Sequence, residues 1–583
     1  MTANGKGSAD GDAPNLDAAV VPGAAARDAA SFEEIADRTG GVAAASAFGV
    51  DLRAIVDSWG VILGRARAQP AAVLESTRHL GAELARIWLS SSDLAADPAD
   101  ARFADPAWQE HPVFRRIGQS YLAWSRSLDD WLARSGLEGI DRERARFVLD
   151  AARDVLAPVN VLVSNPQALR TLRESGGKSL IAGLKNFVDD LQHNHGYPAV
   201  ADRHAFELGQ DVAASAGSVI FKNDILELIQ YQPKTPSVAA TPMLYVFSQV
   251  NRFYLGDLTP DRSLFQRLLD AGIQVFAVSW KNPTEAERNW NIDSYAAGVI
   301  DAIGVMRSVT GQNKVHLMGL CAGGLVSAAA AGVLQARGDD WIDALSLFVN
   351  VLDFRPDDSD FGLFVSERSV EAQKAMVRAR GVFNEKNVFE MFALLRIEDN
   401  IMGFFRSNYL LGQPPLKHPL LFWSMDYTRV PAEMQCDFLD LSQYNRLAEG
   451  EQRVLGQQID LASIHYPVYV MAGSTDHITP WRACYRSTQL FGGEVTFVLT
   501  NQNHTQTISG RLDNRHLKHW VAQALPADPE LALAGAEEQP GSWTFHWIDW
   551  LRARSHDAVP APLALGSADY PPLYPAPGKY ARA

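Results

Sequence analysis

The spacing of hydrophobic residues divides the chain into two parts with different patterns. From about residue 31 to residue 204, apolar residues recur every three or four positions, as in the segment 113–136, and this spacing is typical of amphipathic helices. A further helical pattern over residues 142–164 runs up to Asn165-Pro166, a pair that breaks helices, so we expect a helix to end there. The first part therefore predicts a helical N-terminal domain over residues 31–204.

A different rhythm begins after residue 205, where short apolar runs alternate with amphipathic helices. Uninterrupted apolar runs are typical of parallel strands that the intervening helices bury on both faces. The runs that we expect to form strands are 243–247, 273–280, 314–320, 345–354, 466–473 and 495–500. Residues 205–583 therefore predict an α/β domain built on a doubly wound sheet.

The alternation stops between about residues 355 and 445, where the sequence is irregular and rich in aromatic residues. An insertion between the two halves of a doubly wound sheet usually builds a cap over the carboxyl ends of the strands, where such folds bind ligands. We therefore expect residues 355–445 to form a cap over a binding site.

Composition and charge narrow the possible functions. The chain has 583 residues, enough for more than one hydrophobic core, and its hydrophobic content of 47% is ordinary for a globular protein. A net charge of −15 argues against nucleic-acid binding, because phosphate neutralisation needs clustered basic residues. The three cysteines are too few and too scattered for a disulfide framework or a zinc site, so a reducing cytoplasm fits them best.

The N-terminal sequence and the hydropathy of the chain do not indicate membrane insertion. Residues 1–30 are rich in Ala, Gly and Asp, lack the pattern of a signal peptide, and predict a disordered leader. No apolar run reaches the roughly 18 residues that a transmembrane helix needs. We therefore expect no transmembrane segment, and we expect the protein to meet any hydrophobic phase from the aqueous side.

The segment Gly319-Leu320-Cys321-Ala322-Gly323 lies between a predicted strand and a predicted helix. This G-x-C-x-G arrangement is that of a nucleophile elbow, in which small residues permit a tight turn around the nucleophile. The N-terminus of the following helix would stabilise negative charge on the Cys321 sulfur, and the Ala322 N–H would face an oxyanion. The alternative is a glycine-containing turn with a buried structural cysteine.

Two later residues fit a catalytic triad with Cys321. Asp476 follows the predicted strand 466–473, and His504 follows the predicted strand 495–500. The order nucleophile, acid, histidine is that of the α/β-hydrolase fold, which is the fold class that we expect. His477 could compete as the base, but on a turn its side chain should point away from that of Asp476, which favours a structural role.

A cysteine at the elbow changes the expected chemistry. A thiolate is a strong nucleophile near neutral pH and exchanges acyl groups readily with other thiols. Transfer of an acyl group from a coenzyme A thioester to Cys321 would be nearly isoenergetic, so the group would stay activated for an acceptor other than water. A hydrolase gains little from this property, and the residue therefore favours acyl transfer from a thioester.

Longer blocks of the sequence resemble the polyhydroxyalkanoate synthases, most closely the single-subunit type associated with medium-chain monomers. The blocks that carry the resemblance are 102–124, 251–264, 279–290, 319–324, 476–493, 541–551 and 570–580. The resemblance implies polymerisation of (R)-3-hydroxyacyl groups from coenzyme A thioesters into a polyester, with release of coenzyme A. We expect no metal and no cofactor beyond the coenzyme A thioester that serves as substrate.

The same resemblance implies roles for the candidate residues. Cys321 would carry the acyl group or the growing chain, His504 would deprotonate the thiol and the attacking 3-hydroxyl, and Asp476 would orient His504 or assist the hydroxyl directly. The oxyanion hole would combine the Ala322 N–H with a second N–H near Val250. The resemblance also implies a homodimer that works at the surface of a polyester granule, with a cap that moves to admit substrate.

Three segments depart from the family pattern. Phe247-Ser248 replaces two prolines, Asn503 and Thr505 replace the glycine before and the isoleucine after the histidine, and Ile397 replaces a proline in the cap. Glycine permits a positive φ, and asparagine is the next most tolerant residue. Two other functions stay open: a thioesterase or polyester depolymerase on the same fold, and a weakly active granule-coating protein that keeps the fold for binding.

Overall fold

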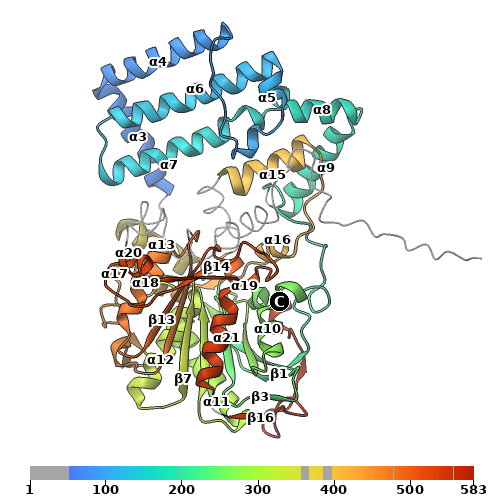
Figure 1. Ribbon diagram of the computed structural model, residues 1–583, viewed down its shortest axis with the longest axis vertical. Coiled ribbons are helices and arrows are strands. Elements are labelled where there is room, and N and C mark those ends of the chain that lie inside the picture. Colours follow the sequence, from blue (N-terminus) through green and yellow to red (C-terminus); the bar gives the residue numbers. More distant parts are fainter. Residues whose placement is uncertain (1–51, 195, 356–366, 385–396, 477, 556) are drawn as a thin grey trace, which may run out of the picture.

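The chain folds into a helical N-terminal part and a large mixed sheet with helices on both faces (Figure 1). A computed structural model describes residues 52–194, 196–355, 367–384, 397–476, 478–555 and 557–583. The predicted leader over residues 1–30 and the alternative base His477 lie outside the described residues, so both stay predictions.

The first part is helical, as the spacing of apolar residues predicts. Its helices are α3 (Leu52–Ala68), α4 (Pro70–Trp88), α5 (Ala107–Glu110), α6 (Pro112–Arg134), α7 (Gly139–Leu156), α8 (Pro166–Glu174) and α9 (Lys178–His193). Buried residues of α6 and α7, including Trp131 and Val148, pack with Ile62 of α3 in a small core separate from the sheet. The apolar faces of α3, α6 and α7 are therefore buried against one another within the helical part.

The prediction that a helix ends at Asn165-Pro166 is wrong, because this pair begins a helix. α7 already ends at Leu156, and two short 3-10 turns follow it. The Asn165 side chain accepts the Ala168 N–H at 3.0 Å and so caps α8, which starts at Pro166. Proline suits the first helical position, because its φ matches the helix and its missing N–H would have no intrahelical partner there.

The main sheet has 11 strands in the order β15-β14-β13-β12-β7-β6-β4-β5-β2-β1-β17. Its six central strands run parallel to one another: β5 (Val275–Trp280), β4 (Met243–Val246), β6 (Val315–Leu320), β7 (Ile342–Phe348), β12 (Val468–Gly473) and β13 (Val495–Thr500). All six correspond to apolar runs that the sequence predicts as strands. The expectation of a doubly wound parallel sheet is therefore confirmed.

Antiparallel strands that the sequence analysis did not predict extend both edges of the sheet. They are β1 (Gly217–Lys222), β2 (Leu226–Tyr231), β14 (Lys518–Val521), β15 (Glu537–Pro540) and β17 (Tyr574–Pro575). Short two-stranded pairings join β3 (Ser237–Ala239) to β16 (Ala558–Pro560), β8 (Val382–Phe383) to β9 (Val430–Pro431), and β10 (Arg453–Val454) to β11 (Gln457–Gln458). The outermost strand β15 consists of Glu, Gln and Pro, and so has no apolar run to recognise.

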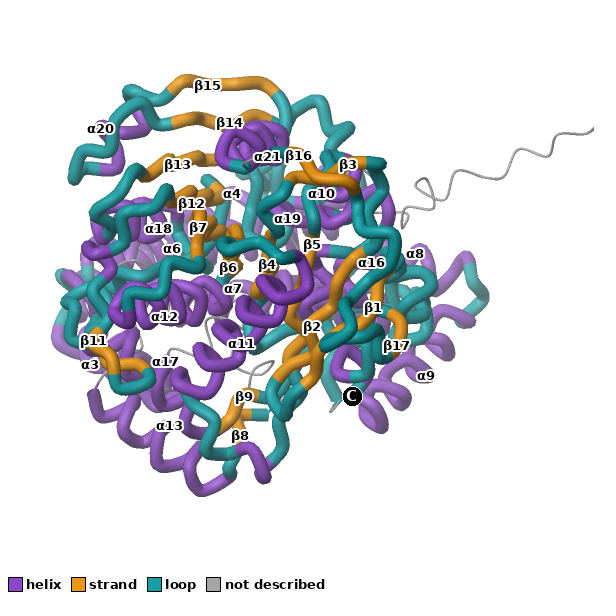
Figure 2. The backbone as a smooth tube through the Cα atoms, turned by 90° about the horizontal axis from the view of Figure 1, so that it is seen from below, coloured by secondary structure: helices purple, strands orange, loops and turns teal. Residues whose placement is uncertain are grey.

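Helices cover the sheet on both faces, as Figure 2 shows. α11 (Ile292–Thr310) and α12 (Ala322–Arg337) pack on one face, and α10 (Leu264–Asp270) and α21 (Trp543–Arg554) pack on the other. Side chains of β4 alternate between the two: Leu244 and Val246 belong to the core of α11 and α12, whereas Met243 and Tyr245 belong to the core of α10 and α21. Within the described ranges, no helix is both long enough and apolar enough to cross a membrane.

The segment predicted as a cap, residues 355–445, lies between the neighbouring strands β7 and β12. Its described elements are α13 (Glu367–Arg380), two π-helical turns (Glu398–Met402 and Arg406–Leu410) on either side of α15 (Gly403–Phe405), α16 (Pro419–Ser424) and α17 (Ala432–Tyr444). Phe404 and Trp423 pack in the same hydrophobic cluster as Cys321. Thr428 of the segment donates hydrogen bonds to the Gln249 and Val250 carbonyls in the turn after β4, so the segment lies against the carboxyl end of that strand. After this segment, the α/β domain has three further short helices: α18 (Trp481–Arg486), α19 (Gln506–Ser509) and α20 (Pro529–Ala534).

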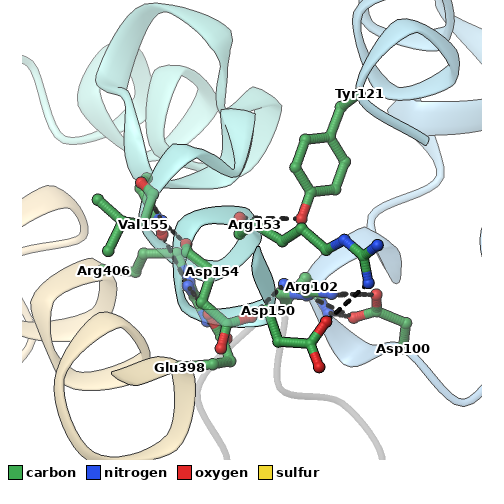
Figure 3. Close-up of polar contacts among 10 residues, drawn as sticks. Asp100, Arg102, Tyr121, Asp150, Arg153, Asp154, Val155, Glu398 and Arg406 are labelled. Carbon is green, nitrogen blue, oxygen red and sulfur yellow. Dashed lines mark hydrogen bonds and ion pairs between the residues drawn. The ribbon is translucent and has the colours of Figure 1, made fainter. Parts of the chain in front are cut away.

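A cluster of charged and polar residues joins the N-terminal helices to the 397–410 helix, which comprises the two π-helical turns and α15 (Figure 3). The buried Arg406 donates to Asn160 Oδ1 at 2.7 Å and pairs with Glu398. Asn160 in turn donates to the backbone carbonyl of Asp154 at 2.7 Å, and Arg102 pairs with the Asp154 carboxylate at 3.2 Å. Burial, together with the nearby Glu398, raises the pKa of Asp154 to about 6.

Further contacts of the 397–410 helix also come from the N-terminal part. The Tyr409 hydroxyl donates to Asp190 Oδ2 at 2.9 Å, and Asn408 Nδ2 donates to the Ala199 carbonyl at 2.8 Å. Gly183 lets α9 approach closely, because a Cβ there would lie 2.0 Å from the Tyr409 carbonyl oxygen. The N-terminal helices therefore hold a segment whose Phe404 reaches the core around Cys321.

Replacing Arg406 with Met leaves the partly buried Glu398 without its partner. We expect the free energy of unfolding to fall by about 3 kcal/mol and amide exchange in residues 397–410 to rise. Arg146→Met is the control, because Arg146 pairs with Glu143 on the surface, and the change should stay within about 0.5 kcal/mol. Thermal unfolding and hydrogen exchange measure both effects, and equal behaviour of the two variants would contradict the role of Arg406.

Candidate active site

Cys321 sits at a sharp turn between the end of β6 and the start of α12. Its φ of 52° and ψ of −131° lie outside the usual regions for a residue with a side chain, as in a strained nucleophile elbow. Two glycines permit the turn: a Cβ on Gly319 would lie 2.6 Å from the Gly324 Cα, and a Cβ on Gly323 would lie 2.5 Å from the Val246 carbonyl oxygen. The sequence context of an elbow therefore corresponds to the backbone geometry of one.

Asp476 and His504 meet at the carboxyl ends of β12 and β13. His504 Nδ1 and Asp476 Oδ2 are 2.7 Å apart, and both side chains are buried. The other carboxylate oxygen, Asp476 Oδ1, accepts the backbone N–H groups of Ile478 at 2.8 Å and Thr479 at 3.0 Å. The carboxylate is thus fixed on both sides and presents one oxygen to the imidazole.

Opposite charges and hydrogen bonds hold this pair in its ionised form. Burial alone would raise the pKa of Asp476, but the charge of His504 and hydrogen bonds from His504 and Thr479 lower that pKa below its usual value. Burial also opposes charge on His504, yet the charges of Asp476 and Cys321, with a side-chain hydrogen bond to each, hold the pKa of His504 well above its usual value. Because Asp476 occupies Nδ1, the imidazole presents Nε2 to the sulfur.

The structure therefore brings Cys321, His504 and Asp476 together in one buried row. The order of the three residues in the sequence predicts this triad. The strands that precede them come together only in the folded sheet, in the order β13-β12-β7-β6. Such a row can pass a proton from a thiol to an imidazole whose charge a carboxylate stabilises.

The two predicted oxyanion donors lie on either side of a close backbone contact. Ala322 is the first residue of α12, and Val250 lies in the turn after β4, which passes over Gly323. The Val250 N–H donates to Ser248 Oγ at 3.3 Å. Ser248, one of the two residues expected to depart from the family pattern in this turn, therefore fixes the turn through its hydroxyl, which is the partner of the Val250 N–H.

Two of the other departures from the family pattern fit their surroundings. Asn503 does not adopt a positive φ, so the substitution for glycine needs no left-handed backbone. Its side-chain oxygen accepts the Gln506 N–H at 3.2 Å and begins the short helix α19. Ile397 has helical backbone angles ahead of the first π-helical turn.

Two residues near the triad were missed by the sequence analysis. The Thr479 hydroxyl donates to Asp476 Oδ2 at 2.7 Å and lies 3.1 Å from His504 Nδ1. A hydroxyl three residues after an acidic turn residue is a local signal that could have identified Thr479. Asn350 donates to the Cys321 carbonyl oxygen at 2.7 Å, but 29 residues separate the two, so no local pattern indicates this contact.

The other two cysteines are buried outside the elbow turn, and burial favours the protonated thiol in both. Burial, with Asp476 adding to it, raises the pKa of Cys484 well above its usual value, and burial raises the pKa of Cys436 to about 11. The Cys484 thiol donates to the Thr479 carbonyl at 3.3 Å. Among the described residues, no group of three or more His, Cys, Asp or Glu side chains is arranged to hold a metal ion.

The fold and this site define an α/β-hydrolase-fold protein with a cysteine at the nucleophile elbow. The family model of the alpha/beta hydrolase fold matches residues 254–508, and the model of the poly-beta-hydroxybutyrate polymerase (PhaC) N-terminus matches residues 99–268. The second model therefore spans most of the helical part, from α5 to α9, and the first strands of the sheet.

Similar proteins narrow the class to one family. Poly(3-hydroxyalkanoate) polymerase 2 from Ectopseudomonas oleovorans is 41% identical over 512 residues, which are 87% of this chain and 91% of that protein. Poly(3-hydroxyalkanoate) polymerase 1 from the same organism is 38% identical over 91% of this chain and 95% of that protein. The polymerase subunit PhaC from Cupriavidus necator is 33% identical over 89% and 90%, respectively. The chain belongs to the poly(3-hydroxyalkanoate) polymerase family.

Gly323→Ala tests the close contact that shapes the elbow. The added Cβ would meet the backbone of Val246 and Phe247, which cannot move without breaking the sheet, so we expect a loss of roughly 2–3 kcal/mol in the free energy of unfolding. Gly304→Ala in α11 is the control, because a Cβ at Gly304 has no atom within 4 Å, and helix propensity should stabilise the protein slightly. Denaturant unfolding compares the two, and a harmless Gly323→Ala would contradict the proposed constraint.

Proposed function

We propose that this protein polymerises (R)-3-hydroxyacyl groups from coenzyme A thioesters into a polyester and releases coenzyme A. The observation that carries the proposal is the buried row of Cys321, His504 and Asp476 in a chain of the poly(3-hydroxyalkanoate) polymerase family. The reaction needs no cofactor beyond the thioester substrate, because thiol exchange and proton transfer suffice for it.

The first half of the reaction acylates the enzyme. His504 takes the proton of the Cys321 thiol, and the sulfur attacks the thioester carbonyl of the substrate. The Ala322 N–H and a second N–H of the turn after β4, near Val250, stabilise the oxyanion. Collapse of the tetrahedral intermediate breaks the bond to the coenzyme A sulfur, which leaves with the proton from His504 as the free thiol.

The second half extends the chain. The 3-hydroxyl of another hydroxyacyl unit loses its proton to His504 or, alternatively, with direct help from Asp476, and its oxygen attacks the acyl group on Cys321. An ester bond forms, the bond to sulfur breaks, and the thiol regains a proton. The buried position of Cys321 supports an acceptor other than bulk water, because the nucleophile is 6% exposed beneath residues of the 355–445 segment.

The reaction product distinguishes polymerisation from the two alternative functions, hydrolysis and granule coating. Purified protein is mixed with (R)-3-hydroxyoctanoyl-CoA, and free coenzyme A and the molecular mass of the acyl product are measured. Polymer supports the synthase, free hydroxy acid supports a thioesterase or depolymerase, and no release of coenzyme A supports a granule-coating protein. The same preparation, analysed by light scattering, tests the predicted homodimer.

Cys321→Ser tests the proposed nucleophile. A hydroxyl in place of the thiol is a weaker nucleophile and a poorer partner for thioester exchange, so we expect polymerisation to fall by about 100-fold or more. Cys436→Ser is the control, because Cys436 is buried in α17 away from the site, and this variant should keep most of the activity. Full activity of Cys321→Ser with coenzyme A release would falsify the assignment.

We further propose that the protein works in the cytoplasm at the surface of its polyester granule, and α9 supports this placement. One face of α9, about a third of its circumference, exposes Leu180, Ile181, Leu184, Phe187, Val188 and Leu191. Ile181 is 72% exposed and Leu184 is 62% exposed, which is unusual for neighbouring large apolar residues. A water-insoluble product supplies an apolar surface for such a face.

The double variant Ile181→Lys, Leu184→Lys tests this face. Two charges in place of large apolar side chains should weaken binding to polyester particles by about tenfold or more. The control is Gln109→Lys, Gln210→Lys, which adds the same charge at exposed polar positions and should bind like the wild type. Sedimentation of protein with particles measures the bound fraction, and equal binding of all three proteins would rule out α9 as the contact.

A further inference from the structure

The turn over residues 247–251, between β4 and the next helical turn, lies directly above the elbow. On one side it contacts Gly323, where a Cβ would lie 2.6 Å from the Phe247 carbonyl oxygen. Phe247 packs in the hydrophobic cluster that contains Cys321, whereas Val250 packs in the cluster on the other face of the sheet. The turn therefore crosses the top of the sheet beside the nucleophile.

The backbone of this turn is held by hydrogen bonds on every side. Trp280 Nε1 donates to the Phe247 carbonyl at 2.9 Å, and Val250 donates to Ser248 Oγ at 3.3 Å. From the 355–445 segment, Thr428 Oγ1 donates to the Gln249 carbonyl at 2.8 Å, and the Thr428 N–H donates to the Val250 carbonyl at 3.2 Å. These hydrogen bonds fix the position of the turn between the elbow and the 355–445 segment.

The Gln249 side chain is unpaired at both ends, and Asn251 Nδ2 in the same turn also has no hydrogen-bond partner among the described residues. Gln249 is 2% exposed, and neither its Oε1 nor its Nε2 has a hydrogen-bond partner among the described residues. Two other buried amides each have at least one partner: Asn350 Nδ2 donates to the Cys321 carbonyl, although Asn350 Oδ1 is unpaired among the described residues, and Asn408 Nδ2 donates to the Ala199 carbonyl. A buried carboxamide with both ends unpaired is unfavourable unless a ligand supplies the missing partners.

We propose that Gln249 is a substrate-recognition residue that binds the 3-hydroxyacyl unit. This inference rests on the proposed function, which brings such a unit to Cys321 next to the turn. A 3-hydroxyacyl group carries a hydroxyl that can donate to Oε1 and a carbonyl that can accept from Nε2, so it matches both unpaired ends of the carboxamide. A saturated acyl chain lacks the hydroxyl and would leave Oε1 unpaired.

The consequence is selectivity for hydroxylated substrate in the acylation step. A site built to hydrogen-bond a substrate hydroxyl rejects an analogue that lacks it, because the buried protein group then stays without a partner. Gln249 would thereby also hold the hydroxyacyl unit in one orientation while Cys321 attacks its carbonyl. A purely structural glutamine would have no such effect on the choice of substrate.

The test compares two substrates in a single turnover. Wild type and Gln249→Met, in excess over substrate, are mixed with (R)-3-hydroxyoctanoyl-CoA or with octanoyl-CoA, and released coenzyme A is followed by chromatography. Wild type should acylate faster with the hydroxylated substrate, and the ratio of the two rates should fall by about tenfold in Gln249→Met. The melting temperature of Gln249→Met should rise, because an apolar side chain of similar size replaces an unpaired buried amide.

Gln274→Met is the matched control. Gln274 is also buried, but its Nε2 donates to the Ala239 carbonyl at 2.9 Å at the far end of the sheet. This variant should lower the melting temperature and leave the rate ratio unchanged, the opposite of Gln249→Met.

Three outcomes overturn the inference in distinguishable ways. Equal wild-type rates with the two substrates overturn it without any variant. An unchanged ratio in Gln249→Met overturns the role of Gln249 while the proposed function stands. If wild type releases no coenzyme A from either substrate, the proposed function itself fails, and the inference falls with it.

Discussion

The backbone of the first turn of α12 is in direct contact with the backbone of the turn after β4, and this contact shapes the active site. A Cβ at Gly323 would lie 2.5 Å from the Val246 carbonyl oxygen, so any larger residue would push the helix away from the sheet. The close approach turns Cys321 into a conformation with positive φ and places its sulfur beside the His504 ring. It also places the N-terminus of α12 beside the 247–251 turn, so that backbone N–H groups of both can donate to an oxyanion.

Two buried carboxylates of the α/β domain each have several hydrogen-bond partners. Asp476 accepts two backbone N–H groups, the Thr479 hydroxyl and the His504 ring, so a carboxylate can stay ionised where burial alone would neutralise it. Glu227 in β2 likewise accepts from the Tyr574 hydroxyl and from two backbone N–H groups of the C-terminal segment. The buried amide of Gln249, in contrast, has no partner at either end among the described residues, and this indicates a place for a ligand.

The N-terminal helices contribute to the site without supplying a residue of the triad. They hold the 397–410 helix through Arg406, Asn408 and Tyr409, and Phe404 of the same helix packs in the core around Cys321. The regular hydrogen bonding of an α-helix is interrupted there by two π-helical turns, which recur at functional sites in other proteins. The position of this segment therefore depends on packing between parts that are more than 200 residues apart in the sequence.

The sequence alone determined the six central strands, the elbow and the three triad positions. Strands buried on both faces appear as continuous apolar runs, and the elbow has a local spacing of small residues that the tight turn requires. It did not reveal the edge strands β14 and β15, because one face of an edge strand can be polar, nor the true role of Asn165-Pro166, because the same pair can end or begin a helix. Only the tertiary structure decided the contacts of Thr479 and Asn350, the hydroxyl of Ser248 on Val250, and the isolation of the Gln249 amide. These depend on distances between separate elements, which local patterns of hydrophobic and polar residues do not encode.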